Sequence, residues 1–439
     1  MSLNLSSIKQ EIEDQYLNDE NPRPWIVGFS GGKDSTMLLQ LVWLAVNNLP
    51  KEFRNSRPIY VVCNNTLVEN PKIIKYTEQV LDNIQHAAVE QSLPFFVIRT
   101  TPKLEDTFWV NLLGKGYPAP NNAFRWCTER LKIDPTTEFI KSKISEVGEA
   151  IILLGTRVDE SSNRSKSIAK SKIHIDGERL RKHILPNAYV FAPIKDVTTP
   201  EVWQYLNQIQ SPWGSNNKQL NALYRNANGG DCPLVIDDTT PSCGNSRFGC
   251  WVCTVVKRDK SMEALIENGE DWMEPLVEFR DMLVRHRNEP SWRESRRRNG
   301  MEGEGILGPY KPEKRAYMLE LLLKAQKEIR QQEPEMTLIN YQELVAIQVT
   351  WHRDSIFNFN VADIYNRIYG TNYGGADFGD INVFEKGALK ETCRAKGDFE
   401  LLNELLEIQK SKFILVNSYG LQNEIEDHLE RHVKKHKAQ

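Results

Sequence analysis

The residues best suited to chemistry lie in one short turn, Ser30-Gly31-Gly32-Lys33-Asp34-Ser35, between an apolar segment and a helical pattern. Main-chain amides at a helix N-terminus attract anions, and glycines let the chain approach phosphate oxygens without Cβ atoms in the way. Lys33 adds a point charge, and Ser30 and Ser35 add hydroxyl donors. The turn therefore predicts a phosphate site. Its spacing matches neither the G-x-x-x-x-G-K-[ST] loop nor the G-x-G-x-x-G fingerprint.

Two readings of the turn stay open at this point. The turn could be a tight strand-to-helix connection without a ligand, although the apolar strand before it favours the phosphate site. Asp34 could contact Mg²⁺, directly or through water, or it could cap the helix.

Cysteines form the second candidate site. Four of the seven lie within 22 residues, Cys232, Cys243, Cys250 and Cys253, with ten, six and two residues between neighbours. A Cys-x-x-Cys step lets two thiolates reach one metal centre, so the four suit structural Zn²⁺ or a [4Fe–4S] cluster. Spacing alone leaves both open.

Strand and helix patterns alternate through the first 160 residues. Apolar runs rich in β-formers at 25–29, 58–63, 94–100 and 150–157 alternate with helical patterns at 34–48, 71–90 and 134–147. This alternation predicts an α/β domain with a parallel sheet. Because ligands of such sheets lie beyond the carboxyl ends of the strands, the turn at Ser30 and the segments after residues 64 and 154 are expected to share one crevice.

The rest of the chain is less regular and then helical. We expect an exposed loop or hairpin at 161–185, an irregular region at 186–255, and helices at 259–287, 312–331, 339–350, 361–368 and 398–409. The predicted organisation is an N-terminal helix (1–23), the nucleotide domain (24–200), a cysteine-rich segment (201–260) and a helical C-terminal region (261–439).

Composition limits the classes of protein. The 439 residues carry a formal net charge of −3 and 40% apolar residues, which is ordinary for a globular protein. No run reaches the ~20 apolar residues of a membrane span, and the first residues lack a signal-peptide pattern. We expect a cytoplasmic protein without a membrane partner.

Basic residues gather in two places despite the net charge. One run holds Arg164, Lys166, Lys170, Lys172, Arg179, Arg181 and Lys182, and the other holds Arg287, Arg293, Arg296, Arg297 and Arg298 around Trp292. Such runs suit a phosphate backbone, and Trp292 could stack on a base or sugar. A solvated charged face is the alternative. Their position around a nucleotide site favours DNA.

The turn and three later segments resemble the PP-loop ATP pyrophosphatases, and among them the PAPS reductases. "SGGKDS" is similar to the PP-loop, and the other segments are "NNTLVENP" (64–71), "FRWCTERLKI" (124–133) and "GTRVDESSNRS" (155–165). Asn65 stands where PAPS reductases place Asp. The resemblance implies that the loop holds the β,γ-pyrophosphate of ATP, with Asn65 and Gly155 at the nucleotide.

The same resemblance implies further residue roles. Lys33, Asp34, Arg157 and Cys127 become the candidate catalytic residues, and the candidate contacts to a substrate phosphate are Arg125, Lys132, Arg157, Glu160 and Arg164. Glu160 could orient Arg157 or sit in a surface ion pair. Cys127 could carry or relay sulfur as an activated thiolate, or it could be a packed thiol beneath Trp126.

The cysteine spacing behind this domain resembles that of the DndC family of DNA phosphorothioation proteins, which is similar to SspD. The resemblance implies a [4Fe–4S] cluster on the four cysteines, Mg²⁺-dependent cleavage of ATP to AMP and pyrophosphate, and activation of a DNA backbone phosphate for sulfur incorporation. A cysteine desulfurase of the DndA or IscS type, DndD and DndE are the implied protein partners. The alternatives are a PAPS or APS reductase, a tRNA thiolation enzyme, and a DNA-binding scaffold whose loop binds ATP without cleaving it.

Overall fold

The computed structural model describes residues 4–17, 22–160, 174–175, 180–226, 249–303, 305–372, 399–402 and 404–405. The chain divides into two compact units, Met1–Ala346 and Ile347–Gln439. The first unit contains the sheet and all the residues that form the candidate site described below.

A seven-stranded sheet organises the first unit, in the order β3-β2-β1-β4-β7-β6-β5. The strands are β1 (Trp25–Gly28), β2 (Ile59–Asn64), β3 (Phe95–Thr100), β4 (Ala150–Leu153), β5 (His174–Ile175), β6 (Leu180–Lys182) and β7 (Ala188–Phe191). The pairs from β3 to β7 are parallel, with Trp25 opposite Ile59 on one side and Ile151 on the other. The short strands β6 and β5 add an antiparallel edge. The α/β class with a mostly parallel sheet is confirmed.

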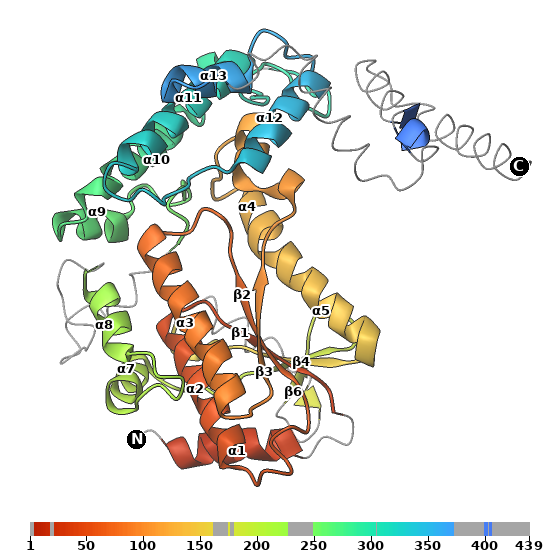
Figure 1. Cartoon of the computed structure of the whole chain (residues 1–439), viewed down its shortest axis with the longest axis vertical. Helices are drawn as coiled ribbons and strands as arrows, with labels where there is room; N and C mark the ends of the chain where they lie inside the picture. The colour runs from red at the N-terminus through yellow and green to blue at the C-terminus, as the bar shows by residue number, and fades with distance from the viewer. Residues whose placement is uncertain are drawn as a thin grey trace, which may run out of the picture. The chain divides into compact units, whose positions relative to one another are not determined.

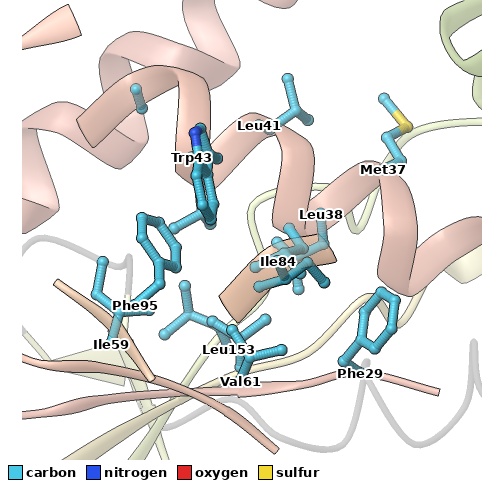
Figure 2. Packing of buried hydrophobic residues seen from close by; sticks show 14 of the residues in the cluster. Phe29, Met37, Leu38, Leu41, Trp43, Ile59, Val61, Ile84, Phe95 and Leu153 are labelled. Carbon is cyan, nitrogen blue, oxygen red and sulfur yellow. The ribbon is translucent and has the colours of Figure 1, made fainter. Parts of the chain in front are cut away.

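Helices cover both faces of the sheet (Figure 1). On one face, α2 (Lys33–Asn48), α3 (Pro71–Glu90) and α7 (Thr199–Gln208) bury the larger core. Figure 2 shows part of this core, with Phe29, Met37, Leu38, Leu41, Trp43, Ile59, Val61, Ile84, Phe95 and Leu153 labelled. On the other face, α5 (Asp134–Val147) packs Ile140 against Ile26, Val62 and Ile152. Strands buried on both faces explain why the sequence shows continuous apolar runs rather than alternation.

The remaining elements of the first unit are mostly helical. They are α1 (Leu5–Leu17), α4 (Trp126–Thr128), α8 (Asn217–Asn226), α9 (Lys260–Glu267), α10 (Glu274–His286) and α11 (Pro312–Ile329), with short helices at 104–106, 110–114, 129–133, 158–160, 271–273 and 290–292. Residues of α12 (Tyr341–Arg353) fall on both sides of the division, and α13 (Val361–Tyr369) belongs to the second unit. No helix in the described part of the chain is both long and apolar enough to cross a bilayer.

Two predicted segments differ from the structure. The region 186–255 is not irregular in its described part, because it contains β7, α7 and α8. The start of α7 carries a capping box between Thr198 and Glu201. The single helix expected at 259–287 is two helices, α9 and α10, and Gly269 with φ +98° lies in the break between them.

One close backbone approach joins the sheet to the first turn of α2. A Cβ atom built on Gly155, just after β4, would lie 2.9 Å from the Asp34 carbonyl oxygen and 3.2 Å from the Ser35 amide nitrogen. Both neighbours are backbone, which cannot rotate away. Only glycine therefore lets the end of β4 pass this close to the start of α2.

Replacing Gly155 should separate these two elements. We expect Gly155→Ala to lower the free energy of unfolding by about 1–3 kcal/mol, measured by urea denaturation. Gly28→Ala is the matched control, because the same atom there would lie 3.4 Å from the Leu154 side chain and 3.8 Å from the Leu153 carbonyl oxygen, both ordinary contacts. Equal urea midpoints for the two variants would contradict the constraint.

Candidate functional site

The candidate site lies where the strand order reverses. The chain leaves β1 toward β2 and β3 and then returns to β4 on the other side of β1. In open parallel sheets this reversal creates a crevice at the carboxyl ends of the strands. The 30–35 turn follows β1, residues 65–70 follow β2, and residues 154–157 follow β4. The three segments that the sequence placed in one crevice therefore do share this edge.

The turn is held in shape by its own hydroxyls and by a helix beside it. Gly31 has φ +71°, and a Cβ atom there would lie 2.3 Å from Thr77 Oγ1 on α3. Ser35 Oγ accepts from the Ser30 amide at 3.2 Å and lies 3.0 Å from the Gly32 carbonyl oxygen, to which it donates. Gly32 then takes the N-cap position of α2, without a side-chain cap. The N-cap residue of α2 thus offers no side-chain oxygen to the first amides of the helix, which suits an anion site.

Tyr224 of α8 lies against this turn. Its hydroxyl accepts a long hydrogen bond, 3.4 Å, from the Lys33 amide, and the Lys33 ammonium lies 5.6 Å from its ring centroid. The ring packs edge-on to Trp203 of α7 at 5.0 Å. An aromatic ring and its hydroxyl therefore border the position where the turn would bind phosphate.

Asp34 and Arg157 form a buried ion pair at the carboxyl edge of the sheet, beyond β1 and β4. Arg157 Nε donates to Asp34 Oδ1 at 2.7 Å, and Lys33 Nζ donates to Asp34 Oδ2 at 3.2 Å. Arg157 is 0% exposed, and its other nitrogens donate to the Val197 carbonyl at 2.9 Å and to Thr199 Oγ1 at 3.0 Å. Both oxygens of Asp34 thus already bind cations.

This arrangement changes the role expected for Arg157. The guanidinium nitrogens already donate hydrogen bonds to Asp34, Val197 and Thr199. Arg157 therefore positions Asp34 and does not reach a substrate phosphate. Asp159, not considered from the sequence, lies 3.5 Å from Arg157 and accepts the Thr199 amide at 2.9 Å. That amide hydrogen bond is the main reason why the pKa of Asp159 lies below its ordinary value. The side chain of Glu160 and the whole of Arg164 lie outside the described residues.

Asn65 shapes the segment after β2. Its side-chain oxygen accepts the Leu67 amide at 2.8 Å, and Leu67 has φ +64°. The Asn65 amide donates to the Thr100 carbonyl at 2.8 Å. The carboxamide thus closes a local turn, an interaction that Asn and Asp side chains make readily.

The described half of the cysteine-rich segment is bound to that same turn. Cys250 forms a β-bridge with Glu69, and the Trp251 amide donates to the Val68 carbonyl at 3.0 Å. Cys250 Sγ lies 3.5 Å from Thr66 Oγ1, and the Cys253 amide donates to the Cys250 carbonyl at 3.0 Å. Two of the four predicted ligands therefore lie on one tight turn beside the crevice.

A lysine and a third thiol lie next to this turn. Lys132 Nζ is 3.4 Å from Glu69 Oε1. Burial alone lowers the pKa of Lys132, but Cys250, Glu69 and Cys127 together raise it above its ordinary value. Burial is also the main cause that raises the pKa of Cys127, followed by the nearby Cys253, and burial with Glu69 raises the pKa of Cys250 to about 12. Cys127 thus lies near Cys253, and the raised pKa of its thiol means that it is not activated in this environment.

Two of the four predicted metal ligands lie among the described residues. Cys232 and Cys243 lie outside the described residues, and within the part that is described no three His, Cys, Asp or Glu side chains form a metal site. The Cys250–Cys253 turn fits a Cys-x-x-Cys half-site, because the Cys253 amide donates to the Cys250 carbonyl and so closes one tight turn that carries both cysteines. The cluster stays a prediction.

The comparison with known families identifies the fold of this site. The sequence model of the phosphoadenosine phosphosulfate reductase domain matches residues 24–256, more than half of the chain. The chain belongs to this family. The match runs from β1 through the turn at Ser30, the Arg157 segment and the Cys250–Cys253 pair.

Individual relatives are more distant. The uncharacterized protein MJ0066 of Methanocaldococcus jannaschii is 26% identical over 270 residues, which cover 62% of this chain and 44% of that protein. The chain therefore spans less than half of that relative.

Three solved structures resemble this chain only weakly. They are the phosphoadenylyl-sulfate reductase of Candida auris (TM-score 0.29, 11% identity, 51% of this chain and 93% of that chain), the U34-tRNA thiolase NcsA of Methanococcus maripaludis with its [4Fe-4S] cluster (0.31, 13%, 64% and 80%) and the NH3-dependent NAD synthetase of Campylobacter jejuni (0.28, 13%, 47% and 75%). At these TM-scores the likenesses say nothing about the reaction of this family member.

The second basic run differs from its prediction. Trp292 is 6% exposed and stacks on the His286 ring at 4.0 Å, so it cannot stack on a base. Arg287 donates to the Pro120 and Thr254 carbonyls, and the buried Arg293 donates to the Gly308 carbonyl. The exposed members are Arg296, Arg297 and Arg298. Of the first run only Arg181 and Lys182 lie among the described residues.

Several site residues escaped the sequence reasoning. Thr77, Tyr224, Asp159 and Thr199 carry no motif of their own and reach the site only through packing. Glu69 lies inside "NNTLVENP", so the family resemblance already pointed to its neighbourhood.

The buried ion pair predicts an unequal effect of two conservative substitutions. Arg157→Lys keeps the charge but loses the guanidinium hydrogen bonds to Val197 and Thr199, so we expect unfolding to become easier by about 2–4 kcal/mol. Arg99→Lys is the control, because Arg99 pairs with Glu78 and Asp82 at the surface, where such pairs contribute less than about 1 kcal/mol. Urea denaturation measures both. A similar loss of unfolding free energy in the two variants would show that burial of the Asp34–Arg157 pair does not increase its contribution to stability.

Proposed function

We propose that this family member is an ATP pyrophosphatase of DNA phosphorothioate modification. It uses ATP to activate a DNA backbone phosphate, so that sulfur can replace a non-bridging oxygen. The observation that carries the proposal is the joining of two sites: the cysteine turn at Cys250 is bound to Val68–Asn70, beside the Ser30–Ser35 turn. A nucleotide site next to a thiol-rich site suits an enzyme that first activates an oxygen and then exchanges it for sulfur.

The proposed first step is adenylation. A non-bridging oxygen of the DNA phosphate attacks the α-phosphorus of ATP and forms a new P–O bond. The bond between this phosphorus and the oxygen that bridges the α- and β-phosphates of ATP breaks. Pyrophosphate leaves with that electron pair, and its charge is stabilised by the first amides of α2 and by Lys33. Asp34, fixed by Arg157, orients Lys33 toward the leaving group. Mg²⁺ would neutralise the phosphates, and Asp34 could contact it only by giving up a cation it now binds.

The proposed second step is sulfur transfer. A cysteine desulfurase supplies sulfur as a persulfide, which a thiol reduces to hydrosulfide while a disulfide forms. Hydrosulfide then attacks the activated DNA phosphorus, so that a P–S bond forms, the P–O bond to AMP breaks, and AMP leaves with that oxygen. Lys132, which lies near Glu69 and the cysteine turn, would bind the DNA phosphate during this exchange. Cys232, Cys243, Cys250 and Cys253 would hold a [4Fe–4S] cluster, whose contribution when bound is a sulfur-rich, redox-capable surface. DndD and DndE are the further partners of this proposal.

Two other enzyme classes are the alternatives. The first is a sulfonucleotide reductase, which would share the nucleotide domain with this chain. A tRNA thiolase would use the same adenylation chemistry on RNA. Sulfite release from PAPS with thioredoxin would favour the first class, and preferential retention of tRNA over DNA would favour the second.

The products of ATP cleavage test the first step. With MgATP and DNA, we expect pyrophosphate from the adenylation, and AMP once water or a sulfur donor displaces it from the adenylated DNA; anion-exchange chromatography separates these products. Lys33→Ala should lower the rate at least ~10²-fold, because it removes the charge beside the leaving group. Lys51→Ala, an exposed lysine in the loop after α2, is the matched control and should leave the rate unchanged. ADP and orthophosphate as products would refute the mechanism.

Metal analysis tests the second site. Anaerobically purified protein should contain about four irons per chain and absorb visible light. Cys250→Ser should remove most of the iron, whereas Cys63→Ala, which changes a buried thiol at the end of β2, should keep it. A content of one zinc and no iron per chain would show that the cysteines hold a structural zinc ion and not an iron–sulfur cluster.

A further inference from the structure

Helix α8 lies along the first turns of α2 and runs in the opposite direction. At the start of α8, Asn217 Oδ1 accepts a hydrogen bond from Gln40 Nε2 of α2 at 2.9 Å, and both side chains are buried. Near the end of α8, the Tyr224 hydroxyl accepts from the amide of Lys33, the first residue of α2, at 3.4 Å. The two contacts are roughly two turns, or 10 Å, apart in each helix. The pairing of the helices thus brings Tyr224 to the N-terminus of α2.

The Tyr224 hydroxyl lies beside the glycine turn. A Cβ atom built on Gly32 would lie 3.2 Å from this hydroxyl and 3.4 Å from Ser30 Oγ, so both hydroxyls border the same position. Ser30 Oγ in turn lies 3.2 Å from Ser35 Oγ. Three hydroxyls and the first amide of α2 therefore surround Gly32. Hydroxyls and helix N-terminal amides are donors that bind phosphate oxygens.

Packing fixes the position of this hydroxyl. Tyr224 is 8% exposed and belongs to the larger core, where its ring lies edge-on to the Trp203 ring at 5.0 Å. The Lys33 ammonium lies 5.6 Å from the Tyr224 ring centroid, within the range of a cation–π contact. A tyrosine held in this way loses little side-chain entropy when a ligand binds to its hydroxyl.

The hydrogen bond between the Lys33 amide and Tyr224 is weak. Its length of 3.4 Å exceeds the usual range of about 2.7–3.2 Å for N–H···O hydrogen bonds. A charged phosphate oxygen is a stronger acceptor than a neutral phenol oxygen. Because a phenol both accepts and donates, Tyr224 can change from accepting the amide proton to donating its own proton to an oxygen bound at that amide.

We propose that Tyr224 is a further phosphate-binding residue of the site, and that its hydroxyl donates to a pyrophosphate oxygen that the Lys33 amide also binds. The inference rests on the proposed function, in which pyrophosphate leaves ATP at the turn. The proton stays on the phenol, so the contact binds and orients the leaving group and is not an acid–base step. Tyr224 reaches the turn only through the packing of α8 on α2, and the sequence of the turn itself does not predict it.

A different role of the hydroxyl predicts the opposite effect on binding. A hydroxyl that only satisfied the Lys33 amide would compete with the anion for that donor, so its removal would strengthen anion binding. A hydroxyl that donates to the anion weakens binding when it is removed. The sign of the change in pyrophosphate affinity therefore separates the two roles.

Isothermal titration calorimetry with inorganic pyrophosphate and Mg²⁺, without nucleotide or DNA, measures this change. Tyr224→Phe keeps the ring and its contacts with Trp203 and Lys33 and removes only the hydroxyl. We expect its dissociation constant for pyrophosphate to rise about 10-fold, because a hydrogen bond to a charged group is lost.

Tyr16→Phe is the matched control. Tyr16 is a buried tyrosine of the same core, and its hydroxyl donates to the Arg54 and Arg57 carbonyls at 2.8 and 3.2 Å. These carbonyls follow the C-terminal end of α2, a helix roughly 24 Å long, so the pyrophosphate affinity of this variant should equal that of the parent. Urea denaturation without ligand checks that both variants fold.

The outcomes separate this inference from the proposed function. Equal or tighter pyrophosphate binding by Tyr224→Phe would overturn the role of Tyr224 and leave the proposed function standing. A similar loss of affinity in Tyr16→Phe would also overturn it, because the effect would then not depend on the position of the hydroxyl. Absence of pyrophosphate binding by the parent protein would overturn both this inference and the phosphate site of the proposed function.

Discussion

The ion pair between Asp34 and Arg157 is the interaction on which the candidate site depends. It joins the first turn of α2 to the segment after β4 at the point where the strand order reverses. A buried guanidinium is stable only when its donors are satisfied, and here Asp34, Val197 and Thr199 satisfy them. Gly155 allows the two backbones to meet closely enough for this contact. The position of Lys33 thus follows from a network that extends to the start of α7.

The cysteine-rich segment (201–260) contacts the surroundings of the nucleotide turn at two points. In its first described part, Tyr224 at the end of α8 contacts the Lys33 amide. In its second described part, which begins at residue 249, Cys250 pairs with Glu69 in the segment that follows β2. A ligand bound at the turn and a metal centre in the segment would therefore share structural supports, and any coupling between their binding free energies must be reciprocal.

Much of this arrangement could be predicted from the sequence, and the limits are physical. The apolar runs and the glycine-lysine turn predicted β1 to β4, α2, α3 and α5, because these signals are local. Strand β7 and helix α8 were missed since the turn-forming residues around them dominate that region. The roles of Arg157 and Trp292 could not be predicted from residue type alone. An exposed arginine or tryptophan can bind a ligand, whereas a buried one contributes to the core, and burial is set by the tertiary structure.

Arginine content overstates the basic surface of this protein for the same reason. Arg280, Arg293 and Arg315 are buried, and each donates to main-chain carbonyls in irregular segments. Carbonyls outside helices and sheets need donors when buried, and one guanidinium can satisfy several of them. Arg280 of α10 binds the carbonyls of Cys253, Val256 and Lys257, so the chain after the cysteine turn is fixed to that helix. Helix α10 therefore serves the cysteine turn as a scaffold, and these buried arginines contribute to packing rather than to the basic surface.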